Sequence, residues 1–377
     1  MALRDVAGVR TLRAFQYLSA SAAFTPQIVR ELDELERLQP MWDRLTAGSS
    51  SLMQTYTWVR ACAEITLAAG DELYFLTGKT SAPITLAPLV RRCGKHTRLE
   101  LLGVHELYEP MDFLYGTPSA LEPLAEAIAQ LQTPLLLQRI PSDSPVVAAL
   151  QSAYRGRGLV LRRLMPGCPW IPLDESWLQP EQYLNAGRRS DLRRAQRIAE
   201  SLGPVRGEIL SPTPAELPSL LEEALHVEAA GWKGREGSAL LHDVVRGPFC
   251  RRYAALASQQ GILRLCFLRI GAHAVAMQLA VEYGGAFWLL KIGYDESFAR
   301  CSPGSQLLVE TIRYAAARGL RSYEFLGTPA PWTRVWTLLE RPCVSLWVYP
   351  AKIQGVTTLA MDAATAARRR LNRLMWD

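Results

Sequence analysis

The chain has 377 residues, of which 49% are hydrophobic and 21% are charged. This balance is typical of a folded protein and excludes a chain that is mainly disordered. At roughly 150 residues per domain, the length predicts two or three domains. The 42 basic and 36 acidic residues give a net charge of +6, which permits a polyanionic partner without requiring one. Only five of the basic residues are lysines: Lys79, Lys95, Lys233, Lys291 and Lys352.

The cysteine and histidine patterns argue against a metal protein and against a disulfide-stabilised one. Seven cysteines are spread along the chain without a C-x-x-C pair, and the histidines have no carboxylate or cysteine at ligand spacing. The stretch from Met1 to Arg10 lacks the apolar core of a signal peptide. No segment reaches the roughly 18 apolar residues of a membrane span. We therefore expect a cytoplasmic location, no membrane span and no metal.

In chain order, the first half is predicted to begin with a strand and two helices, followed by a strand hairpin. Hydrophobic periodicity and turn residues set the boundaries. A third strand, a helix and a strand follow, and a last helix and strand end near Leu164. The predicted elements are Leu12–Leu18, Pro26–Leu45, Gln54–Ala69, Leu73–Thr77, Pro83–Val90, Arg98–Leu102, Leu121–Leu131 and Leu135–Arg139.

The second half is predicted to repeat the same order of elements about 190 residues later. Its hairpin turns at Gly271-Ala272-His273, and its last helix and strand end near Tyr349. The other predicted elements are Val205–Leu210, Pro214–Ala229, Val244–Gln259, Ile262–Ile270, Ala274–Tyr283, Ala286–Asp295, Gly304–Arg318 and Ser322–Leu326. A repeat of so many elements in one order indicates two similar domains.

These elements predict an α/β fold made of two tandem domains, each a mixed, mostly antiparallel sheet flanked by helices. We expect an N-terminal domain over 1–165 and a linker with an arginine-rich helix over 166–203. A C-terminal domain over 204–350 and a C-terminal helix over 351–377 follow. In each domain, the third strand crosses over through a helix to a parallel neighbour, which places a helix N-terminus beside strand ends.

One such helix start has the composition of an anion site. Pro303-Gly304 begins the crossover helix of the second half, with Ser302 and Ser305 as caps and Arg300 just outside. The equivalent start in the first half, Pro118-Ser119, is followed by the acidic Glu122 and has no arginine nearby. A phosphate is therefore expected in the second half, held by Arg300, Ser302, Gly304 and Ser305, and the first half is expected to be non-catalytic.

Several motifs in this order resemble those of a known superfamily. They are Leu86-Ala87-Pro88-Leu89, Met111-Asp112-Phe113-Leu114, the arginine-rich Gly187–Arg194, Glu228–Gly234, Lys291–Asp295 and Arg300–Gly304. The element order resembles the GNAT acyltransferase fold, and two copies in one chain resemble the Fem-type peptidyltransferases. The chain is more similar still to the double-GNAT group associated with cellulose and exopolysaccharide biosynthesis. Unlike the usual [Q/R]-x-x-G-x-[G/A] loop, the segment Arg300–Ser305 reads R-C-S-P-G-S.

The resemblance implies acyl transfer, which needs a base, a donor that polarises the acyl carbonyl and an acid for the leaving group. Glu228, just before the loop Gly231–Gly234, is the candidate base, and Glu282 and Glu324 on strands are its rivals. A carboxylate among apolar neighbours is costly unless it is paired, so Glu324 is either a salt-bridge member or a functional carboxylate. Tyr294 is the candidate acid, although it could simply pack at a sheet edge. Lys291 lies in an apolar strand, where alternation puts it on the face of Leu289 and Gly293, and it could bind an anion or polarise the acyl carbonyl.

The remaining candidates are expected to bind substrate. Glycines around Trp232 and Lys233 permit a close approach to a ligand. The predicted substrate-binding set is Trp232, Lys233, Asp295, Trp332 and Arg334.

Three functions remain open from the sequence. The first is transfer of an acyl group from acyl-CoA or an acyl-carrier protein to an amine or hydroxyl of a small-molecule or saccharide acceptor, by direct attack and with no tightly bound cofactor. The second is Fem-like aminoacyl transfer from tRNA, favoured by the arginine-rich helix. The third is a non-enzymatic binding scaffold. The arginines concerned are Arg188, Arg189, Arg193, Arg194 and Arg197, which could equally form a solvated helix face.

Overall fold

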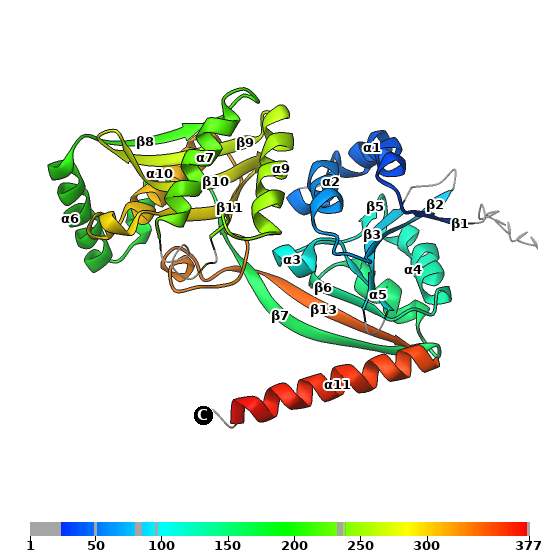
Figure 1. The fold of residues 1–377 in the computed structure, drawn as a ribbon. Helices are drawn as coiled ribbons and strands as arrows, with labels where there is room; N and C mark the ends of the chain where they lie inside the picture. Colours follow the sequence, from blue (N-terminus) through cyan, green and yellow to red (C-terminus); the bar gives the residue numbers. More distant parts are fainter. Residues whose placement is uncertain are drawn as a thin grey trace, which may run out of the picture.

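The computed structural model describes residues 24–48, 51–79, 85–94, 97–231, 237 and 239–374. It confirms the predicted α/β class: two lobes, each with a mixed and largely antiparallel sheet flanked by helices, lie side by side (Figure 1). The strand predicted at Leu12–Leu18 lies outside the described residues. No helix in the described part of the chain is both long enough and apolar enough to cross a membrane.

The N-terminal lobe follows the predicted order after one correction. The segment predicted as a single helix from Pro26 begins as a strand, because Ile28 pairs with Leu76 in an antiparallel ladder. The helix itself starts only at Leu32. The elements of this lobe are β1 Thr25–Val29, α1 Leu32–Thr46, α2 Tyr56–Ile65, β2 Glu72–Lys79, β3 Thr85–Cys93, β4 Thr97–Leu101, α3 Val104–Leu107, β5 Leu114–Tyr115, α4 Leu121–Gln130, β6 Leu135–Pro141, α5 Pro145–Ala153 and β7 Gly158–Pro172.

The C-terminal lobe also has the predicted order as far as its fifth strand. Where a last helix was expected, there is only a short 3-10 turn at Thr333–Val335, since Pro329 and Pro331 interrupt the preceding segment. The elements are α6 Ala186–Leu202, β8 Val205–Leu210, α7 Leu217–Ala229, α9 Arg246–Gln259, β9 Leu263–Ile270, β10 His273–Tyr283, β11 Ala286–Tyr294, η5 Glu296–Cys301, α10 Pro303–Ala317, β12 Ser322–Glu324, β13 Glu340–Pro350 and α11 Ile353–Leu374.

The last strand of the chain joins the sheet of the other lobe. The strand order is β1-β2-β3-β4-β6-β13-β7-β12-β11-β10-β9-β8, with β5 paired to β3. β13 therefore lies between β6 and β7 in the N-terminal lobe, not at the end of the C-terminal sheet as the repeat predicts. The 15-residue β7 makes this possible, because it pairs with β13 over Gly158–Pro169 and then with β12 over Trp170–Pro172. Figure 1 shows β7 and β13 as a long ribbon joining the lobes.

The lobes also share packing between α2 and α9. The Trp58 ring lies edge-on to Phe249 and Tyr253, with centroids 5.0 and 4.9 Å away, and Arg252 forms an ion pair with Glu64. One continuous apolar core includes residues of both lobes. The two lobes are therefore packed against each other through side chains as well as through the β7–β13 ribbon.

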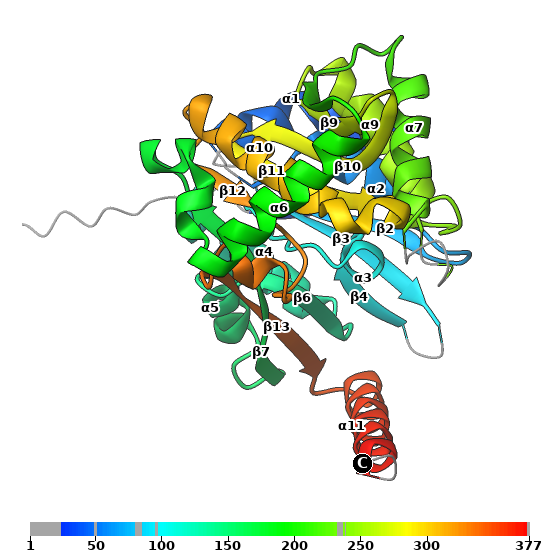
Figure 2. The same cartoon turned by 90° about the vertical axis from the view of Figure 1, so that its left-hand side faces the viewer.

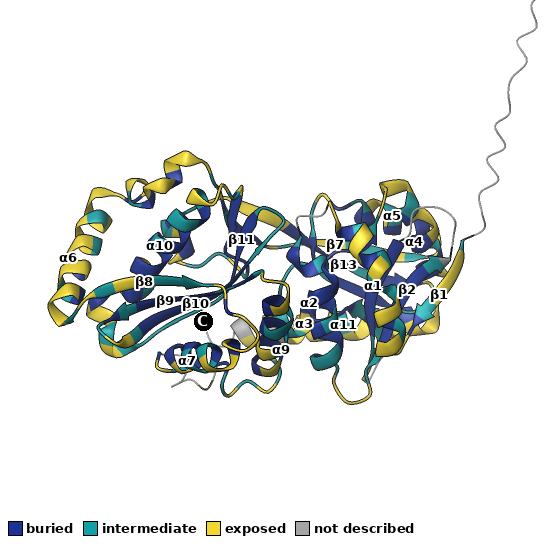
Figure 3. Ribbon diagram, turned by 90° about the horizontal axis from the view of Figure 1, so that it is seen from above, coloured by how far each residue is buried: buried dark blue, intermediate teal, exposed yellow. Residues whose placement is uncertain are grey.

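The C-terminal sheet is covered on both faces. A second apolar core, which includes Phe287, Leu307 and Tyr323, lies between the sheet and α10, whereas α7 and α9 pack on the other face. α6 packs beside α10 and η5, as the second view shows (Figure 2). Most of its surface faces solvent (Figure 3).

Candidate active site

The two parallel strands of the C-terminal lobe pair only briefly. The β11–β12 ladder runs from Ala286–Ser322 to Trp288–Glu324, after which β12 ends while β11 continues along β10 to Tyr294. β11 also has a register shift opposite Leu279 and Ala280. The simple alternation expected around Lys291 is therefore wrong: Leu289 packs toward α10, while Gly293 faces α7.

Glu228 and Lys291 lie near each other beside the diverging end of β11. Glu228 is buried in the last turn of α7, and its Oε2 accepts the backbone N–H of Leu240 at 3.0 Å. A Cβ at Gly293 would lie 2.5 Å from Glu228 Cα, so a glycine is required for this close approach. The charges of Lys291 and Glu228 both act on the thiol of Cys250, whose pKa burial raises to about 11.

Glu109, from the N-terminal lobe, is a charged residue at this place that sequence reasoning missed. Its Oε2 accepts the backbone N–H of Gly327, just after β12, at 3.1 Å, across 218 residues of sequence. Burial raises the pKa of Glu109, opposed by the Gly327 N–H and by the charge of Lys291. Its local sequence, between Glu106 and Asp112, gives no signal of this position, because the contact that matters is between the two halves.

Arg139 was predicted only as the end of a strand, yet it is fully buried between the lobes. Its Nη2 donates to the carbonyl of Gly327 at 2.6 Å, and its guanidinium lies over the Tyr108 ring at 4.5 Å. Its backbone has a positive φ of 53°, and Leu326, at the equivalent place in the repeat, has 57°. Arg139 lies inside β6, where the pairing with β13 shifts register between Ile140 and Leu137, whereas Leu326 lies just after the end of β12.

The predicted anion site lies at the start of α10, next to Tyr294. The Tyr294 ring approaches Gly304 closely enough to contact a Cβ there at 3.7 Å. Pro303 has no N–H, and the amides of Ser305 and Gln306 donate to the Ser302 carbonyl. The donors left for an anion are the Gly304 N–H, the two serine hydroxyls and the exposed Arg300. This is a smaller set of donors than a glycine-rich loop provides.

The structure assigns the other predicted substrate-binding residues to different places. Asp295 caps η5, with its Oδ1 accepting the N–H of Ser297 at 2.9 Å. Trp332 packs edge-on to Phe325 at the surface, and Arg334 lies exposed in the turn before β13. Trp232 and Lys233 lie outside the described residues.

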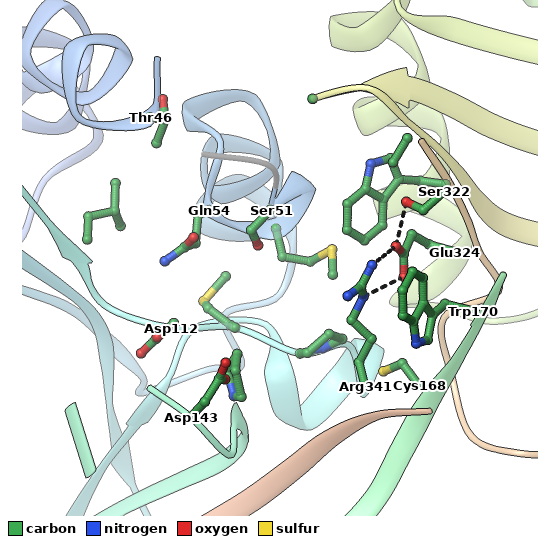
Figure 4. Close-up of a pocket in the computed structure, with 18 of the residues that line it drawn as sticks. Thr46, Ser51, Gln54, Asp112, Asp143, Cys168, Trp170, Ser322, Glu324 and Arg341 are labelled. Carbon is green, nitrogen blue, oxygen red and sulfur yellow. Dashed lines mark hydrogen bonds and ion pairs between the residues drawn. The ribbon is translucent and has the colours of Figure 1, made fainter. Parts of the chain in front are cut away.

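A cavity of about 950 Å³ lies between the lobes, and we call it the inter-lobe cavity. Glu324, predicted as a rival base, faces it with a side chain only 4% exposed. Two nitrogens of Arg341 bind its carboxylate, at 3.2 and 2.7 Å, and Ser322 donates a further bond at 2.7 Å. The Arg341 guanidinium in turn stacks on Trp170, 3.6 Å from its ring centroid (Figure 4). Glu324 is thus held in an ion pair, apart from Glu228 and Lys291.

The opposite wall of the inter-lobe cavity carries a second carboxyl group that sequence reasoning did not select. Burial raises the pKa of Asp112 to about 7, against its hydrogen bonds with Ser144 and the Phe113 N–H. Burial also raises the pKa of Tyr115 to about 12. In Figure 4, Asp112 and Asp143 lie across the cavity from Glu324 and Arg341. Asp112 belongs to the motif Met111-Asp112-Phe113-Leu114, but nothing in its local sequence indicates burial.

Comparison with known proteins agrees with the fold. Residues 186–334 match the model of the acetyltransferase (GNAT) domain. Among solved structures, FemX is 11% identical, with a TM-score of 0.55 over 89% of this chain and 99% of that one. A protein of unknown function from Bacteroides thetaiotaomicron is 10% identical, with a TM-score of 0.55 over 85% of this chain and 100% of that one. No curated protein matches the sequence.

A third solved structure is similar over the same extent. It is the C-terminal domain of a proposed lysylphosphatidylglycerol synthetase from Agrobacterium fabrum, 11% identical, with a TM-score of 0.52 over 89% of this chain and 96% of that one. Identities this low establish the fold alone. The matched segment, residues 186–334, is a GNAT domain match that indicates an acyltransferase and contains Glu228, Lys291, Tyr294 and the start of α10, and the chain as a whole has a Fem-like fold.

Proposed function

We propose that the protein transfers an acyl group from a thioester donor, acyl-CoA or an acyl-carrier protein, to an amine or hydroxyl of a small-molecule or saccharide acceptor. One observation carries this proposal: charged residues of both lobes border the place where β11 and β12 diverge. Lys291 and Glu228 come from the C-terminal lobe, and Glu109 comes from the N-terminal lobe through its bond to Gly327. Such a set can bind the substrates, polarise the acyl carbonyl and deprotonate the acceptor within a water-poor site.

The donor's phosphate is assigned to the start of α10. CoA and the prosthetic arm of a carrier protein both carry phosphate, and Gly304, Ser302, Ser305 and Arg300 supply one amide, two hydroxyls and a guanidinium. The arginine-rich α6 packs against η5, which leads into α10, so its positive charge adds to the attraction at this end. Because few backbone amides are free there, side chains supply part of the contacts to the donor's phosphate.

Direct attack accounts for the roles of the residues near the end of β11. A carboxylate, Glu109 or Glu228, takes a proton from the acceptor nitrogen or oxygen, which then attacks the thioester carbonyl carbon. Lys291 stabilises the negative charge that develops on the carbonyl oxygen. The C–S bond breaks, and the Tyr294 hydroxyl gives its proton to the departing sulfur. The raised pKa of Glu109 suits a proton acceptor, since proton affinity rises with pKa.

The acceptor is assigned to the inter-lobe cavity, whose lining includes Pro110 and Leu326, the chain neighbours of the hydrogen-bonded Glu109 and Gly327. Its volume of about 950 Å³ is enough for a sugar or a small metabolite. Its walls combine aromatic surface from Trp170 and Trp288 with charged groups on both sides, including Asp112 and the Glu324–Arg341 pair.

All seven cysteines are free thiols, which supports a reducing cytoplasm as the compartment.

Native mass spectrometry of the full chain with a series of acyl-CoAs and phosphopantetheine thioesters tests the donor. We expect wild-type protein to retain at least one thioester. Ser305→Asp, which places a negative charge at the start of α10, should weaken retention at least tenfold, since it repels phosphate. Thr357→Asp, on the exposed side of α11, is the matched control and should change nothing. Equal retention by both variants would overturn the assignment, as would no retention by wild type.

Aminoacyl-tRNA is the alternative donor, and the exposed arginine face of α6 favours it. Arg188, Arg193, Arg194 and Arg197 are exposed, and a phosphate backbone would bind them in a salt-dependent way. Retention of aminoacyl-tRNA at low salt, lost in an Arg193→Glu, Arg197→Glu variant, would support this donor. A protein that binds ligands but produces no transferred product, with any donor, would point to a binding scaffold.

A further inference from the structure

Two cysteine thiols lie together in the wall of the inter-lobe cavity. Cys168 on β7 and Cys343 on β13 are both buried, and both line the cavity. Their strands are paired, with Arg341 opposite Cys168 and Cys343 opposite Met165, and the register shifts between these two pairs. The two side chains are hydrogen-bonded to each other. The pair therefore joins the two strands that link the lobes.

A buried guanidinium lies against this pair. Arg139 Nη2 donates to Cys168 Sγ at 2.7 Å, and its charge acts on both thiols. The Arg139 Nε is buried and has no hydrogen-bond partner among the described residues. A fixed cation beside thiols favours the thiolate over the neutral thiol. The site is thus built to hold a negative charge on sulfur.

The two thiols play different parts. The pKa of Cys343 is lowered, chiefly by the hydrogen bond from Cys168 and further by the charge of Arg139. The pKa of Cys168 is raised by that same bond and by burial. Arg139 thus donates to the Cys168 sulfur, the Cys343 S–H donates to the Arg341 carbonyl at 3.7 Å, and Cys343 is the thiol whose pKa is lowered.

The other cysteines lack these features. Burial raises the pKa of Cys62, Cys250 and Cys266, so these thiols stay neutral and unreactive. Burial also raises the pKa of Cys301. Cys93 is exposed at the end of β3. Among the seven, Cys168 and Cys343 are set apart by their shared arginine and their mutual hydrogen bond.

We propose that Cys168 and Cys343 form a redox-active dithiol, which hydrogen peroxide or a small disulfide converts into a disulfide between β7 and β13. With peroxide, the Cys343 thiolate attacks one oxygen, the O–O bond breaks, and the released hydroxide takes a proton to leave as water. The sulfenic acid formed on Cys343 is attacked by Cys168, an S–S bond forms, and a second water leaves. Both sulfurs are oxidised and the peroxide is reduced to two waters.

The position of the pair connects its redox state to the acyl-transfer site. Arg139 contacts Cys168 and also the carbonyl of Gly327, whose N–H binds Glu109. Oxidation replaces the two thiols beside Arg139 with an S–S bond and links β7 covalently to β13 in the cavity wall. The dithiol does not depend on the proposed function, because its oxidation is measured on the protein alone.

The test treats the reduced full chain with hydrogen peroxide, and separately with glutathione disulfide, followed by intact-mass measurement and peptide mapping. We expect two of the seven thiols to be lost, a linked peptide joining Cys168 to Cys343, and full reversal by dithiothreitol. A Cys93→Ser variant should form the same link, and a Cys343→Ser variant should not. The proposal fails if wild-type protein gives no such peptide, or if oxidation stops at Cys93 or at an unlinked sulfinic acid on Cys343. Because the wild-type result needs no variant, misfolding of Cys343→Ser leaves the test intact.

Discussion

At the scale of single residues, the buried surroundings of a charged group decide whether it belongs to the proposed site or to a structural ion pair. Lys291 was selected because it interrupts an apolar strand, and it lies near Glu228 at the end of β11, within electrostatic reach of Glu109. Glu324 was selected because it interrupts apolar neighbours, and it is held in an ion pair with Arg341 instead. The same sequence argument thus led to two different settings. Only the contacts between lobes distinguish them.

Asp112 makes stability depend on pH in a defined window. Its pKa in the folded protein is about 7, above its ordinary value of 3.8, so the folded state binds the extra proton between these values. Stability should therefore fall as the pH rises from about 4 to about 7, by about 4 kcal/mol at most. Asp112→Asn should abolish this component in chemical denaturation across pH. The exposed neighbour Asp143→Asn is the control, and an unchanged pH profile in Asp112→Asn would refute the assignment.

Glu324 should contribute to stability through its ion pair. Glu324→Gln removes the charge that Arg341 binds, and we expect unfolding free energy to fall by about 2 kcal/mol. The loss is moderate because the Arg341 side chain is 49% exposed and water can solvate it. Glu310→Gln, which breaks the exposed pair with Arg313, should cost under about 0.5 kcal/mol. Equal losses in urea denaturation would mean that burial of Glu324 is irrelevant.

At the scale of elements, the repeat in the sequence predicted most helices and strands, including β8 at its observed bounds. It could do so because apolar periodicity and turn residues are local signals. The repeat did not predict β1, because a short strand at the sheet edge has little hydrophobic pattern of its own. Its pairing with β2 is what makes this segment a strand. The repeat also missed the shift in β11, because a register shift depends on the partner strand.

Gly293 is the element-scale contact that sets α7 against β11. An alanine Cβ would lie 2.5 Å from Glu228 Cα, so Gly293→Ala must push the helix away from the strand. We expect a loss of about 1–3 kcal/mol in unfolding free energy. Gly304→Ala is the matched control, because its nearest contact would be an ordinary 3.7 Å. Thermal and urea denaturation compare them, and a Gly293→Ala protein as stable as Gly304→Ala would contradict this packing.

At the scale of the whole molecule, the exchange of strands between lobes could not be read from the sequence. Each half contains a complete order of elements, so the repeat alone predicts two independent sheets. In the structure, β13 completes the N-terminal sheet and β7 reaches the C-terminal one. Glu109 and Arg139, which bind Gly327 across the same boundary, were missed for this reason. The proposed site is therefore formed by residues from both lobes.

This arrangement predicts an asymmetric response to truncation. A chain ending at Leu339 lacks β13 and α11 and leaves β6 and β7 without the strand between them. It should not unfold cooperatively. A chain ending at Ala351 loses only α11, whose ties include the Arg98–Asp362 ion pair, and should keep both sheets. Circular dichroism with urea titration separates the two, and a cooperative transition in the shorter chain would contradict the strand order.

The most direct measurement of the central claim is transfer of an isotope-labelled acyl group from its thioester to a panel of amino sugars, amino acids and small amines, followed by mass spectrometry. Wild-type protein and Lys352→Met, which changes an exposed lysine outside the site, should form the same labelled product. Lys291→Met should lower kcat/KM about 100-fold while the protein stays folded, because the developing oxyanion loses its cation. Equal rates in the Lys291 and Lys352 variants, or no labelled product from wild type with any donor and acceptor, would contradict it.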